Sequence, residues 1–494
     1  MTDLLVLAPM AIEEAALRND GRTLRTGIGP QRARIAAARA QAIDAAGVAV
    51  AGLCGGVSPE LRPGDVVCAT ELRREDGPSV DVPGSALLAA ALRRHGLRVH
   101  VGPMFSADRV LTPAERAKLD GVLAVDMESA WLTDAAEARP LAVLRVVVDG
   151  PGRRLVDPRI AADGIRALRS LRRSRIVLDE WARAIGPRKA LLAGPRSFCA
   201  GVERAIDIVE LALAQRGAPI YVRKQIVHNH HVVADLERRG AIFVEELDEV
   251  PDGATAVFSA HGVSPDVRRN AGNRALDVID ATCPLVSKVH AEARRFAHEG
   301  RTIFLIGHDG HEEVEGTTGE APDSIRLVQD MKDAERIEAP DPDRVAYLTQ
   351  TTLAVDETNE IVEVLRARFP ALRGPGSDDI CYATANRQEA VRKVARDAEV
   401  VLVAGSQTSS NSKRLVEVAE REGARAYLVD DETELDVAWL HGVATVGVTA
   451  GASAPERIVD RLVGALAALG PVEVEERTTT HEDVQFNLPK ELVP

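Results

Sequence analysis

Three cysteines in this chain have the pattern of ligands for an iron–sulfur cluster. Cys199, Cys283 and Cys381 are the only cysteines after residue 190, and each lies in its own motif: GPRSFCAGVERA, DATCPLVSKVH or DDICYATANRQ. A structural zinc site would usually be closed by four ligands, often in CxxC pairs. Three dispersed thiolates instead suit an iron–sulfur cluster with one open iron, although a single buried free cysteine is often only a small apolar residue.

The segments between these cysteines carry isolated His, Ser, Thr and Asn residues in loops that follow apolar runs. These loops are VHNHHVV, FSAHGVSP, GHDGHEEVEGT, TQTT, SSNS and TAGASAPE. Imidazolium, hydroxyl, amide and backbone N–H groups all donate hydrogen bonds to phosphate oxygens. None of the motifs centres on Lys or Arg, which favours a small enclosed diphosphate pocket over an open nucleic-acid surface.

Through these motifs, the chain from about residue 189 to its C-terminus resembles the LytB-type 4-hydroxy-3-methylbut-2-enyl diphosphate reductases of the methylerythritol phosphate route to isoprenoids. The resemblance extends to the tail EDVQFNLPKEL. It implies an oxidoreductase that removes the allylic hydroxyl of its substrate with two electrons and protons, giving isopentenyl and dimethylallyl diphosphate. It also implies that Cys199, Cys283 and Cys381 hold the [4Fe-4S] cluster, and that a ferredoxin or flavodoxin-type protein is the electron donor.

The resemblance further implies two groups of pocket residues. The diphosphate would be bound by His228, His261, His311, Ser409, Ser410, Asn411 and Ser453. Protons for the leaving hydroxyl would come from Glu313, with Thr351 and His311. Glu312 and Glu315 flank Glu313 in a charge run; such a run is usually a solvated face, and only the family register selects Glu313.

Composition restricts the class of protein. The 494 residues carry a net charge of −14, and 45% of them are hydrophobic but only 3% aromatic, so cores of Ala, Val, Leu and Ile are expected. The length predicts three or four core units, and the acidic balance disfavours nucleic-acid or anionic-membrane binding. Acidic residues near the N-terminus, the absence of an apolar run of membrane-spanning length, and few cysteines predict a cytoplasmic protein.

Short apolar runs alternate with helical stretches along the whole chain and predict an α/β fold. The runs are LLVLAP, VAVAGLCGG, LAVLRVVVDG, KALLAGP, ATAVFSAHG, RTIFLIGHDG, RVAYLTQTT, AEVVLVAGS and VATVGVTAG. Such runs, ending in Gly, His, Ser or Thr before a helix, are typical of buried parallel strands with functional groups at their C-terminal ends. A basic helical stretch over 164–189 places a domain boundary near residue 187.

The reductase part is expected to be a pseudo-threefold assembly around the cluster. Its three small parallel-sheet units would comprise residues 188–283 with the tail 465–494, residues 284–377, and residues 378–464. The Cys199 motif lies in the first unit, the Cys283 motif at the junction of the first and second, and the Cys381 motif in the third.

Residues 1–187 contain a different set of motifs: APMAIEEAALR, TGIGPQRA, AGLCGGVSPELRPGDVV, VDMESAWL and RVVVDG. These resemble the nucleoside phosphorylase and methylthioadenosine nucleosidase superfamily, and GIGPQRA and VSPELRPGDVV resemble its hopanoid-associated branch, which removes adenine from adenosylhopane. The resemblance implies an α/β domain that binds an adenine nucleoside. Asp149 would protonate the purine, Glu13 would activate water or assist the base, Glu128 would bind the ribose and Met127 would pack beneath it.

Several alternatives remain open in this domain. Leu53 occupies a position where nucleosidases commonly have a small hydroxylated residue, which favours hydrolysis over phosphorolysis, and Cys54 and Cys68 are expected to be buried apolar residues. Asp149 is also compatible with a simple strand-end turn, and Glu14 competes with Glu13 for the assigned position.

The preferred interpretation is a bifunctional enzyme in which the reductase is fused to an adenine-nucleoside hydrolase. The first alternative keeps the reductase but makes the N-terminal domain a non-catalytic module for nucleoside binding or homodimerisation. The second is a cluster-containing regulatory or RNA-binding protein.

Overall fold

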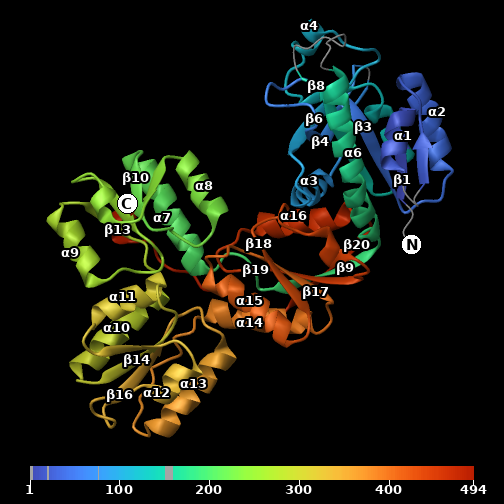
Figure 1. The fold of residues 1–494 in the computed structure, drawn as a ribbon. Helices are drawn as coiled ribbons and strands as arrows, with labels where there is room; N and C mark the ends of the chain where they lie inside the picture. The colour runs from blue at the N-terminus through green and yellow to red at the C-terminus, as the bar shows by residue number, and fades with distance from the viewer. Residues whose placement is uncertain (1–3, 19–21, 76, 151–159, 494) are drawn as a thin grey trace. The chain divides into compact units, whose positions relative to one another are not determined.

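The computed structural model describes residues 4–18, 22–75, 77–150 and 160–493 (Figure 1). Contacts divide the chain into two units. One comprises Met1–Ala190, Asp431–Val446 and Asp460–Glu475, and the other Leu191–Asp430, Gly447–Val459 and Glu476–Pro494. Within the described residues, no helix has both the length and the apolar character that a bilayer crossing requires.

The N-terminal domain is built on a mixed eight-stranded sheet. Its strands are β1 (Leu4–Ala8), β2 (Arg22–Arg25), β3 (Gly47–Gly56), β4 (Val66–Arg73), β5 (Val80–Asp81), β6 (Val99–Ser106), β7 (Ala124–Asp126) and β8 (Leu141–Asp149). The strand order is β2-β1-β3-β7-β6-β4-β5, and β8 pairs with both β3 and β4. The expected parallel pairing holds for β3 with both β1 and β8, whereas β8 runs antiparallel to β4.

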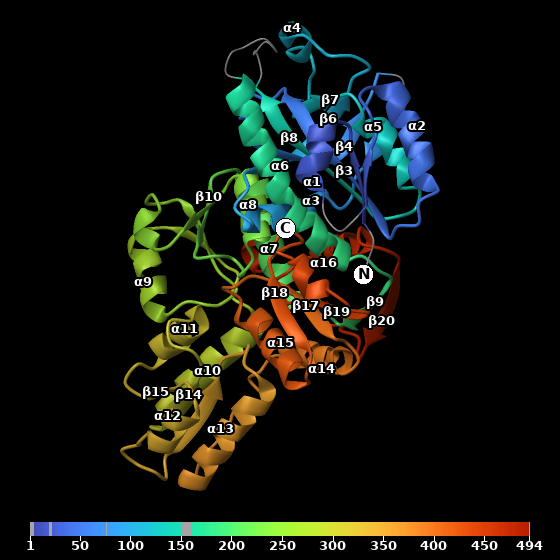
Figure 2. The same ribbon diagram turned by 45° about the vertical axis from the view of Figure 1, so that its right-hand side comes forward.

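Helices cover this sheet. They are α1 (Ala11–Leu17), α2 (Pro30–Gln41), α3 (Ser85–Arg94), α4 (Pro113–Arg116), α5 (Ser129–Leu132) and α6 (Ile160–Arg183). Helix α2 starts with a proline at its first position and buries Ala33, Ala36, Ala37 and Ala40, one face of a helical repeat whose small side chains allow close packing. Figure 2 shows α6 lying along the sheet beside α1 and α3, with which it is in contact.

The basic stretch predicted to be helical forms α6 only as far as Arg183. Residues Arg188 and Lys189 already belong to the next strand, β9 (Arg188–Gly194), so the predicted boundary near residue 187 falls between α6 and β9. The buried positions Leu171, Leu178 and Trp181 follow the period of the helix.

The rest of the chain forms three further sheets, as the apolar runs predicted. The four-stranded sheet has the order β11-β10-β12-β13, the three-stranded sheet β15-β14-β16, and the five-stranded sheet β18-β17-β19-β9-β20. Their strands are β10 (Ile220–Arg223), β11 (Ala241–Val244), β12 (Thr255–Phe258), β13 (Asp277–Asp280), β14 (Thr302–Ile306), β15 (Ile325–Val328), β16 (Val345–Thr349), β17 (Val400–Ala404), β18 (Arg425–Val429), β19 (Thr445–Ala450) and β20 (Val472–Thr478). All pairings in the first two of these sheets are parallel.

Helices connect these strands. They are α7 (Ala200–Arg216), α8 (His230–Arg238), α9 (Pro265–Asn273), α10 (Pro284–His298), α11 (Glu312–Glu320), α12 (Met331–Arg336), α13 (Val355–Arg368), α14 (Tyr382–Ala395), α15 (Ser410–Arg421) and α16 (Glu456–Ala467). In β14, Ile303 and Leu305 pack into the core that contains α10, whereas the alternating Phe304 and Ile306 pack into the core that contains α13. This sheet therefore lies between helical layers, which explains why its strands are apolar throughout (Figure 1).

The sheet pairing differs from the expected division into units. Strands β9 and β20 lie in one sheet with β17 and β19, although residues 188–194 and 472–478 were expected in the unit that ends at residue 283. The final residues do follow the expectation, because Leu488 and Leu492 pack in the core formed by α7 and β10. Strand pairing depends on partners distant in sequence, and an apolar run does not encode which sheet it joins.

One buried cation ties distant segments of the second unit together. Arg387 on α14 is fully buried and donates hydrogen bonds to the carbonyl oxygens of Ser197, at 2.7 and 3.1 Å, and Phe198, at 3.2 Å. Its Nη1 also donates to the carbonyl of Ala383 and to both carboxylate oxygens of Glu482. A single guanidinium therefore links the end of β9, the start of α14 and the C-terminal tail.

Replacing Arg387 by Met is expected to destabilise the second unit by about 3–5 kcal/mol, because the carboxylate of Glu482 and the carbonyl of Ser197 would remain buried without their donor. Hydrogen exchange of α14 amides measures the loss. Arg392→Met is the matched control: Arg392 lies on the same helix and makes ion pairs with exposed carboxylates, so its loss should cost less than about 1 kcal/mol. Equal losses in the two variants would contradict the linking function of Arg387.

Candidate functional site

The three predicted cluster ligands occupy equivalent positions, each as the residue that caps the start of a helix. Cys199 caps α7, Cys283 caps α10 and Cys381 caps α14. The Sγ of Cys381 accepts the backbone N–H of Thr384 at 3.3 Å. Free N–H groups and the helix dipole at such positions favour a thiolate over a neutral thiol.

All three sulfurs face one pocket, and burial there is costly for isolated thiolates. Burial, with a smaller effect of the neighbouring thiols, raises the pKa of Cys283 to about 12; burial and the neighbouring Cys199 raise the pKa of Cys381 to about 11. Gly201 is also adapted to the site, because a Cβ at this residue would lie 2.8 Å from the Sγ of Cys283 and 3.9 Å from the Sγ of Cys199. A bound polycation would remove the penalty on the thiolates, so the donor set fits an iron–sulfur cluster.

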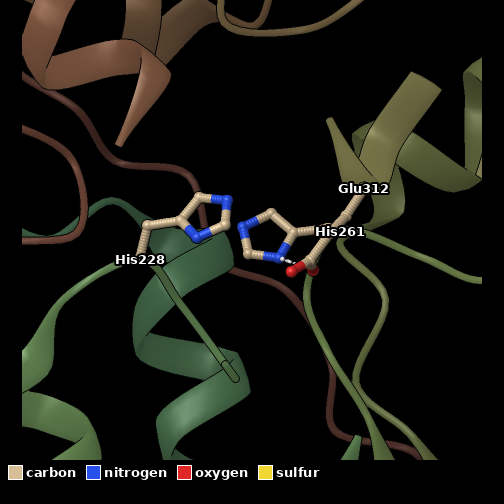
Figure 3. A group of neighbouring side chains, drawn as sticks. All are labelled: His228, His261 and Glu312. Carbon is tan, nitrogen blue, oxygen red and sulfur yellow. Dashed lines mark ion pairs between the residues drawn. The ribbon is translucent and has the colours of Figure 1, made fainter. Parts of the chain in front are cut away.

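A group of three histidines lines the same pocket. The rings of His228 and His261 are stacked, with centroids 4.0 Å apart and planes inclined by 20°. His311 lies edge-on to both, with centroid distances of 5.6 and 6.1 Å. Figure 3 shows the stacked pair with Glu312 beside His261, whose Nδ1 lies 2.9 Å from the Glu312 carboxylate.

Two histidines of this group are disfavoured as cations. Burial, followed by the charges of His261 and His311, lowers the pKa of His228 to about 2. Burial also lowers the pKa of His311, whose Nδ1 accepts the N–H of Glu313 at 3.2 Å. Burial opposes protonation of His261 too, but the adjacent Glu312 carboxylate outweighs it and raises the pKa of His261.

Glu313 is held in a single orientation next to these rings. Its buried carboxylate accepts the hydroxyl of Thr351 at 2.9 and 3.1 Å and the backbone N–H of Thr351 at 2.9 Å. The carbonyl of Thr351 in turn accepts the N–H of Cys381 at 3.1 Å. Hydrogen bonding thus connects the candidate proton donor directly to a cysteine segment.

The predicted Ser and Asn residues complete the pocket wall. Ser409 caps α15, and Asn411 accepts the N–H of Ala452 at 3.2 Å and donates to the hydroxyl of Thr384 at 3.2 Å. Ser453 donates to the carbonyl of His228 at 3.0 Å. Every reductase residue proposed from the sequence lines this one pocket: Cys199, His228, His261, Cys283, His311, Glu313, Thr351, Cys381, Ser409, Ser410, Asn411 and Ser453.

Sequence reasoning missed some residues of the pocket. Glu312 was expected on a solvated face, but this was wrong: its side chain is only 18% exposed and pairs with His261, whereas Glu315 is exposed as expected. The run of acidic residues in the sequence did not indicate which of Glu312 and Glu315 would be buried in the pocket. Thr352, Tyr382 and Phe486 also line the pocket, and Phe486 lies in the tail motif EDVQFNLPKEL.

The predicted residues of the N-terminal domain also meet in one pocket. Glu13, Met127, Glu128 and Asp149 all line it. The Glu13 carboxylate accepts the N–H groups of Met10 and Leu53, both at 2.7 Å, whereas Glu14 makes a surface ion pair with Arg18. The structure therefore selects Glu13 over Glu14 as the residue that faces the pocket.

A fully buried arginine organises the carboxylates of this pocket. Arg145 pairs with Asp126 at 2.8 Å and with Glu128 at 3.7 Å, and the other carboxylate oxygen of Glu128 accepts the N–H of Gly29 at 2.9 Å. Burial raises the pKa of Glu13 and of Glu128, with Arg145 opposing the rise. Such a shift brings a carboxylate closer to the range of a useful general base.

A second buried ion pair was not anticipated. Arg116, at the end of α4, donates to the Asp149 carboxylate at 2.6 Å and lines the pocket. An isolated Arg in PAER has no distinguishing sequence signal. Cys54 and Cys68 are buried, as expected, and burial raises the pKa of both thiols.

Comparisons with known proteins find matches for both parts of the chain. Residues 23–159 match the family described as "Phosphorylase superfamily". A 5′-methylthioadenosine/S-adenosylhomocysteine nucleosidase of Campylobacter jejuni aligns over 36% of this chain and 97% of its own, with 17% identity and a TM-score of 0.32.

The larger part of the chain has closer relatives. A 4-hydroxy-3-methylbut-2-enyl diphosphate reductase of Leifsonia xyli is 60% identical over 308 residues, which cover 62% of this chain and 91% of that protein. The structure of the E-1-hydroxy-2-methyl-but-2-enyl-4-diphosphate reductase from Plasmodium falciparum covers 62% of this chain and 97% of its own, with 38% identity and a TM-score of 0.60. Residues 190–467 match the family described as "LytB protein", and the chain belongs to this family.

Proposed function

We propose that the chain reduces 4-hydroxy-3-methylbut-2-enyl diphosphate to isopentenyl and dimethylallyl diphosphate. The observation that carries this proposal is the single pocket in which three helix-capping cysteines, the Glu313–Thr351 pair and the stacked histidines meet. The 60% identity to a reductase of that name supports it.

Cys199, Cys283 and Cys381 would hold a [4Fe-4S] cluster that has one iron without a protein thiolate. When bound, the cluster supplies electrons singly and an iron that acts as a Lewis acid. A ferredoxin or flavodoxin-type donor is proposed because such proteins deliver single electrons. The reaction consumes two electrons and two protons: the allylic C–O bond breaks, one proton leaves with the hydroxyl as water, and the other is added to the carbon skeleton.

Residues of the chain would bind the diphosphate and supply the proton. The diphosphate would accept hydrogen bonds from His228, His261, Ser409, Ser410, Asn411 and Ser453, and from the N-terminus of α15. Glu313 would supply the proton that leaves with the hydroxyl, because Thr351 fixes its orientation inside the pocket. His311, whose ring packs against the other two histidines, would assist this transfer.

We also propose that the N-terminal pocket hydrolyses an adenine nucleoside, with adenosylhopane as the preferred candidate and methylthioadenosine as the simpler test. Glu13 would activate water, Glu128 would bind ribose hydroxyls, Met127 would pack beneath the sugar and Asp149 would protonate the base. The supporting observation is that all four line one pocket around the buried Arg145. Leu53 presents a backbone N–H to Glu13 and no hydroxyl that would help to bind phosphate.

One observation favours the alternative that this domain binds a nucleoside without cleaving it. The Arg116 guanidinium donates a hydrogen bond to the Asp149 carboxyl group at 2.6 Å, so the group proposed to protonate the purine is already engaged in a buried ion pair. The same alternative includes a homodimer contact through this domain. Ile12, Ile28 and Val110 are half-exposed, and Ile28 and Val110 belong to the wall of the candidate nucleoside pocket.

The protein purified without oxygen is expected to contain about one four-iron cluster per chain, because three thiolates can hold three of its irons. Replacing Cys199, Cys283 or Cys381 by Ser should abolish the cluster or greatly reduce its occupancy, as measured by iron content and visible absorption. Cys54→Ser and Cys68→Ser are the controls, because these thiols lie in the other domain. Preferential uptake of zinc during reconstitution with both metals would overturn the assignment.

Glu313→Gln should retain the cluster and diphosphate binding but reduce kcat about a hundredfold or more. The amide can still hydrogen-bond to Thr351, yet it cannot release a proton to the leaving hydroxyl. Steady-state reduction with a chemical electron donor measures the effect, and Glu315→Gln on the exposed side of α11 is the control. Near-normal turnover of Glu313→Gln would reject the proton-donating role.

The full-length protein should release adenine from methylthioadenosine or adenosylhopane without phosphate. Asp149→Asn should be the most damaging change, because the amide cannot protonate the purine, and Glu128→Gln should raise KM by weakening ribose binding. Cys199→Ser is the control and should retain adenine release. Absence of release with both nucleosides would indicate a binding module, and release only with added phosphate would indicate phosphorolysis.

A further inference from the structure

We propose that Glu312 is a positioning residue of the reductase pocket: its carboxylate holds Nδ1–H of His261 and thereby directs the other ring nitrogen, as an N–H donor, at a phosphoryl oxygen of the substrate. The inference rests on the proposed reductase function. It concerns a residue that the charge run had suggested to be an ordinary solvated glutamate.

The geometry of the pair carries the first step. Oε2 of Glu312 lies 2.9 Å from Nδ1 of His261, and the side chains are only 18% and 11% exposed. The same carboxylate oxygen lies 3.4 Å from the hydroxyl of Ser259. Figure 3 shows the Glu312 carboxylate at one ring nitrogen of His261, whose ring is stacked on that of His228. The contact between Glu312 and His261 is an ion pair and not a formed hydrogen bond. A carboxylate beside one ring nitrogen favours protonation there and so sets the direction of the other ring nitrogen.

The second step is the distribution of charge between the stacked rings. Two imidazoles with centroids 4.0 Å apart cannot both be cations without strong repulsion. Glu312 lies against His261, and Glu313 adds negative charge near the same ring, so the pKa of His261 is raised although burial opposes this. Burial and the two neighbouring histidines lower the pKa of His228 to about 2. Glu312 therefore determines which ring of the stack carries the positive charge.

The third step concerns what the pair presents to a ligand. Nε2 of His228 is buried in the pocket and has no hydrogen-bond partner among the residues that the structure describes. A neutral His228 beside a cationic His261 would offer the diphosphate one ordinary and one charge-assisted hydrogen bond. Lys224 lies close enough to lower the pKa of Glu312 further, so the carboxylate stays charged.

A metal ion is a competing occupant of this group. One donor atom each from His228, His261 and Glu312 can be chosen so that all three lie within 4.8 Å of one another. A tetrahedral zinc site with bonds of about 2.1 Å requires ligand atoms about 3.4 Å apart. The 2.9 Å pair at Nδ1 already has hydrogen-bond length, and nearly parallel ring planes do not aim their lone pairs at one point. The observations therefore favour the positioning role.

The test compares Glu312→Gln with the wild-type holoenzyme, prepared as the full chain without oxygen. At pH 8 the variant should show a KM for the allylic diphosphate raised about tenfold, with kcat changed less than twofold. Calorimetric titration with inorganic diphosphate should show the same loss of affinity, independently of turnover. Glu315→Gln, an exposed residue of the same helix, is the control and should match the wild type.

The pH dependence of diphosphate binding distinguishes this positioning role from a purely structural one. The raised pKa of His261 means that the cation persists to higher pH when Glu312 is charged; without that charge it is lost at lower pH. Binding by Glu312→Gln should therefore weaken at a lower pH than binding by the wild type, and the two should converge at a pH low enough to protonate His261 in both proteins. In a His261→Asn background, Glu312→Gln should have no further effect, because its target is absent.

Several results would overturn the proposed role of Glu312. Unchanged KM and diphosphate affinity in Glu312→Gln would overturn the proposal, as would a loss confined to kcat, which would place Glu312 in the chemical step. Zinc bound by the wild type in one equivalent beyond any cluster metal, and absent from Glu312→Gln, would establish a metal site instead. A wild-type protein without reductase turnover would reject the proposed function, while the diphosphate titration would still decide the part played by Glu312.

Discussion

Burial of three thiols in one pocket is the constraint on which the reductase part of the chain depends. Thiolates without water or a cation are unstable there, and the raised pKa values of Cys283 and Cys381 express this cost. The fold reduces the cost by placing each cysteine at the start of a helix, where backbone N–H groups are free. Arg387 and the Thr351–Cys381 hydrogen bond then tie two of these helix starts to neighbouring segments.

In the same pocket, two neighbouring acidic residues contact different partners. Glu313 is oriented by Thr351, and Glu312 is directed at His261 from the neighbouring position of the same helix. Two consecutive carboxylates thus face different partners because adjacent residues of a helix point about 100° apart. In the proposed function, one carboxylate supplies a proton while the other supports a cation for the diphosphate. This arrangement would let a pocket without a lining Lys or Arg accommodate a highly charged substrate.

The N-terminal domain also depends on a buried charged group, but here the charge is positive. Its buried cation is Arg145, and carboxylates from three parts of the chain gather round it: Glu13 beside the edge of β3, and Asp126 and Glu128 near β7. A fully buried guanidinium requires such partners, because leaving it unpaired would cost several kcal/mol. Arg116 adds a second cation at Asp149, and this pair bears directly on whether the pocket cleaves a nucleoside or only binds it.

Much of this arrangement could be predicted from the sequence. The apolar runs predicted strands β1, β3, β8, β9, β12, β14, β16, β17 and β19, because short continuous hydrophobic segments bounded by Gly, Ser or Thr are typical of strands buried between helical layers. The motifs also identified residues that share one pocket, because polar groups follow the C-terminal ends of β12, β16, β17 and β19, and strands of three sheets contribute to it. The pairing of β9 and β20 with β17 and β19, the antiparallel contact of β8 with β4, and the partners of Glu312 and Arg116 were decided by the tertiary structure alone. Each depends on contacts between residues far apart in the chain, and local residue patterns carry no information about such partners.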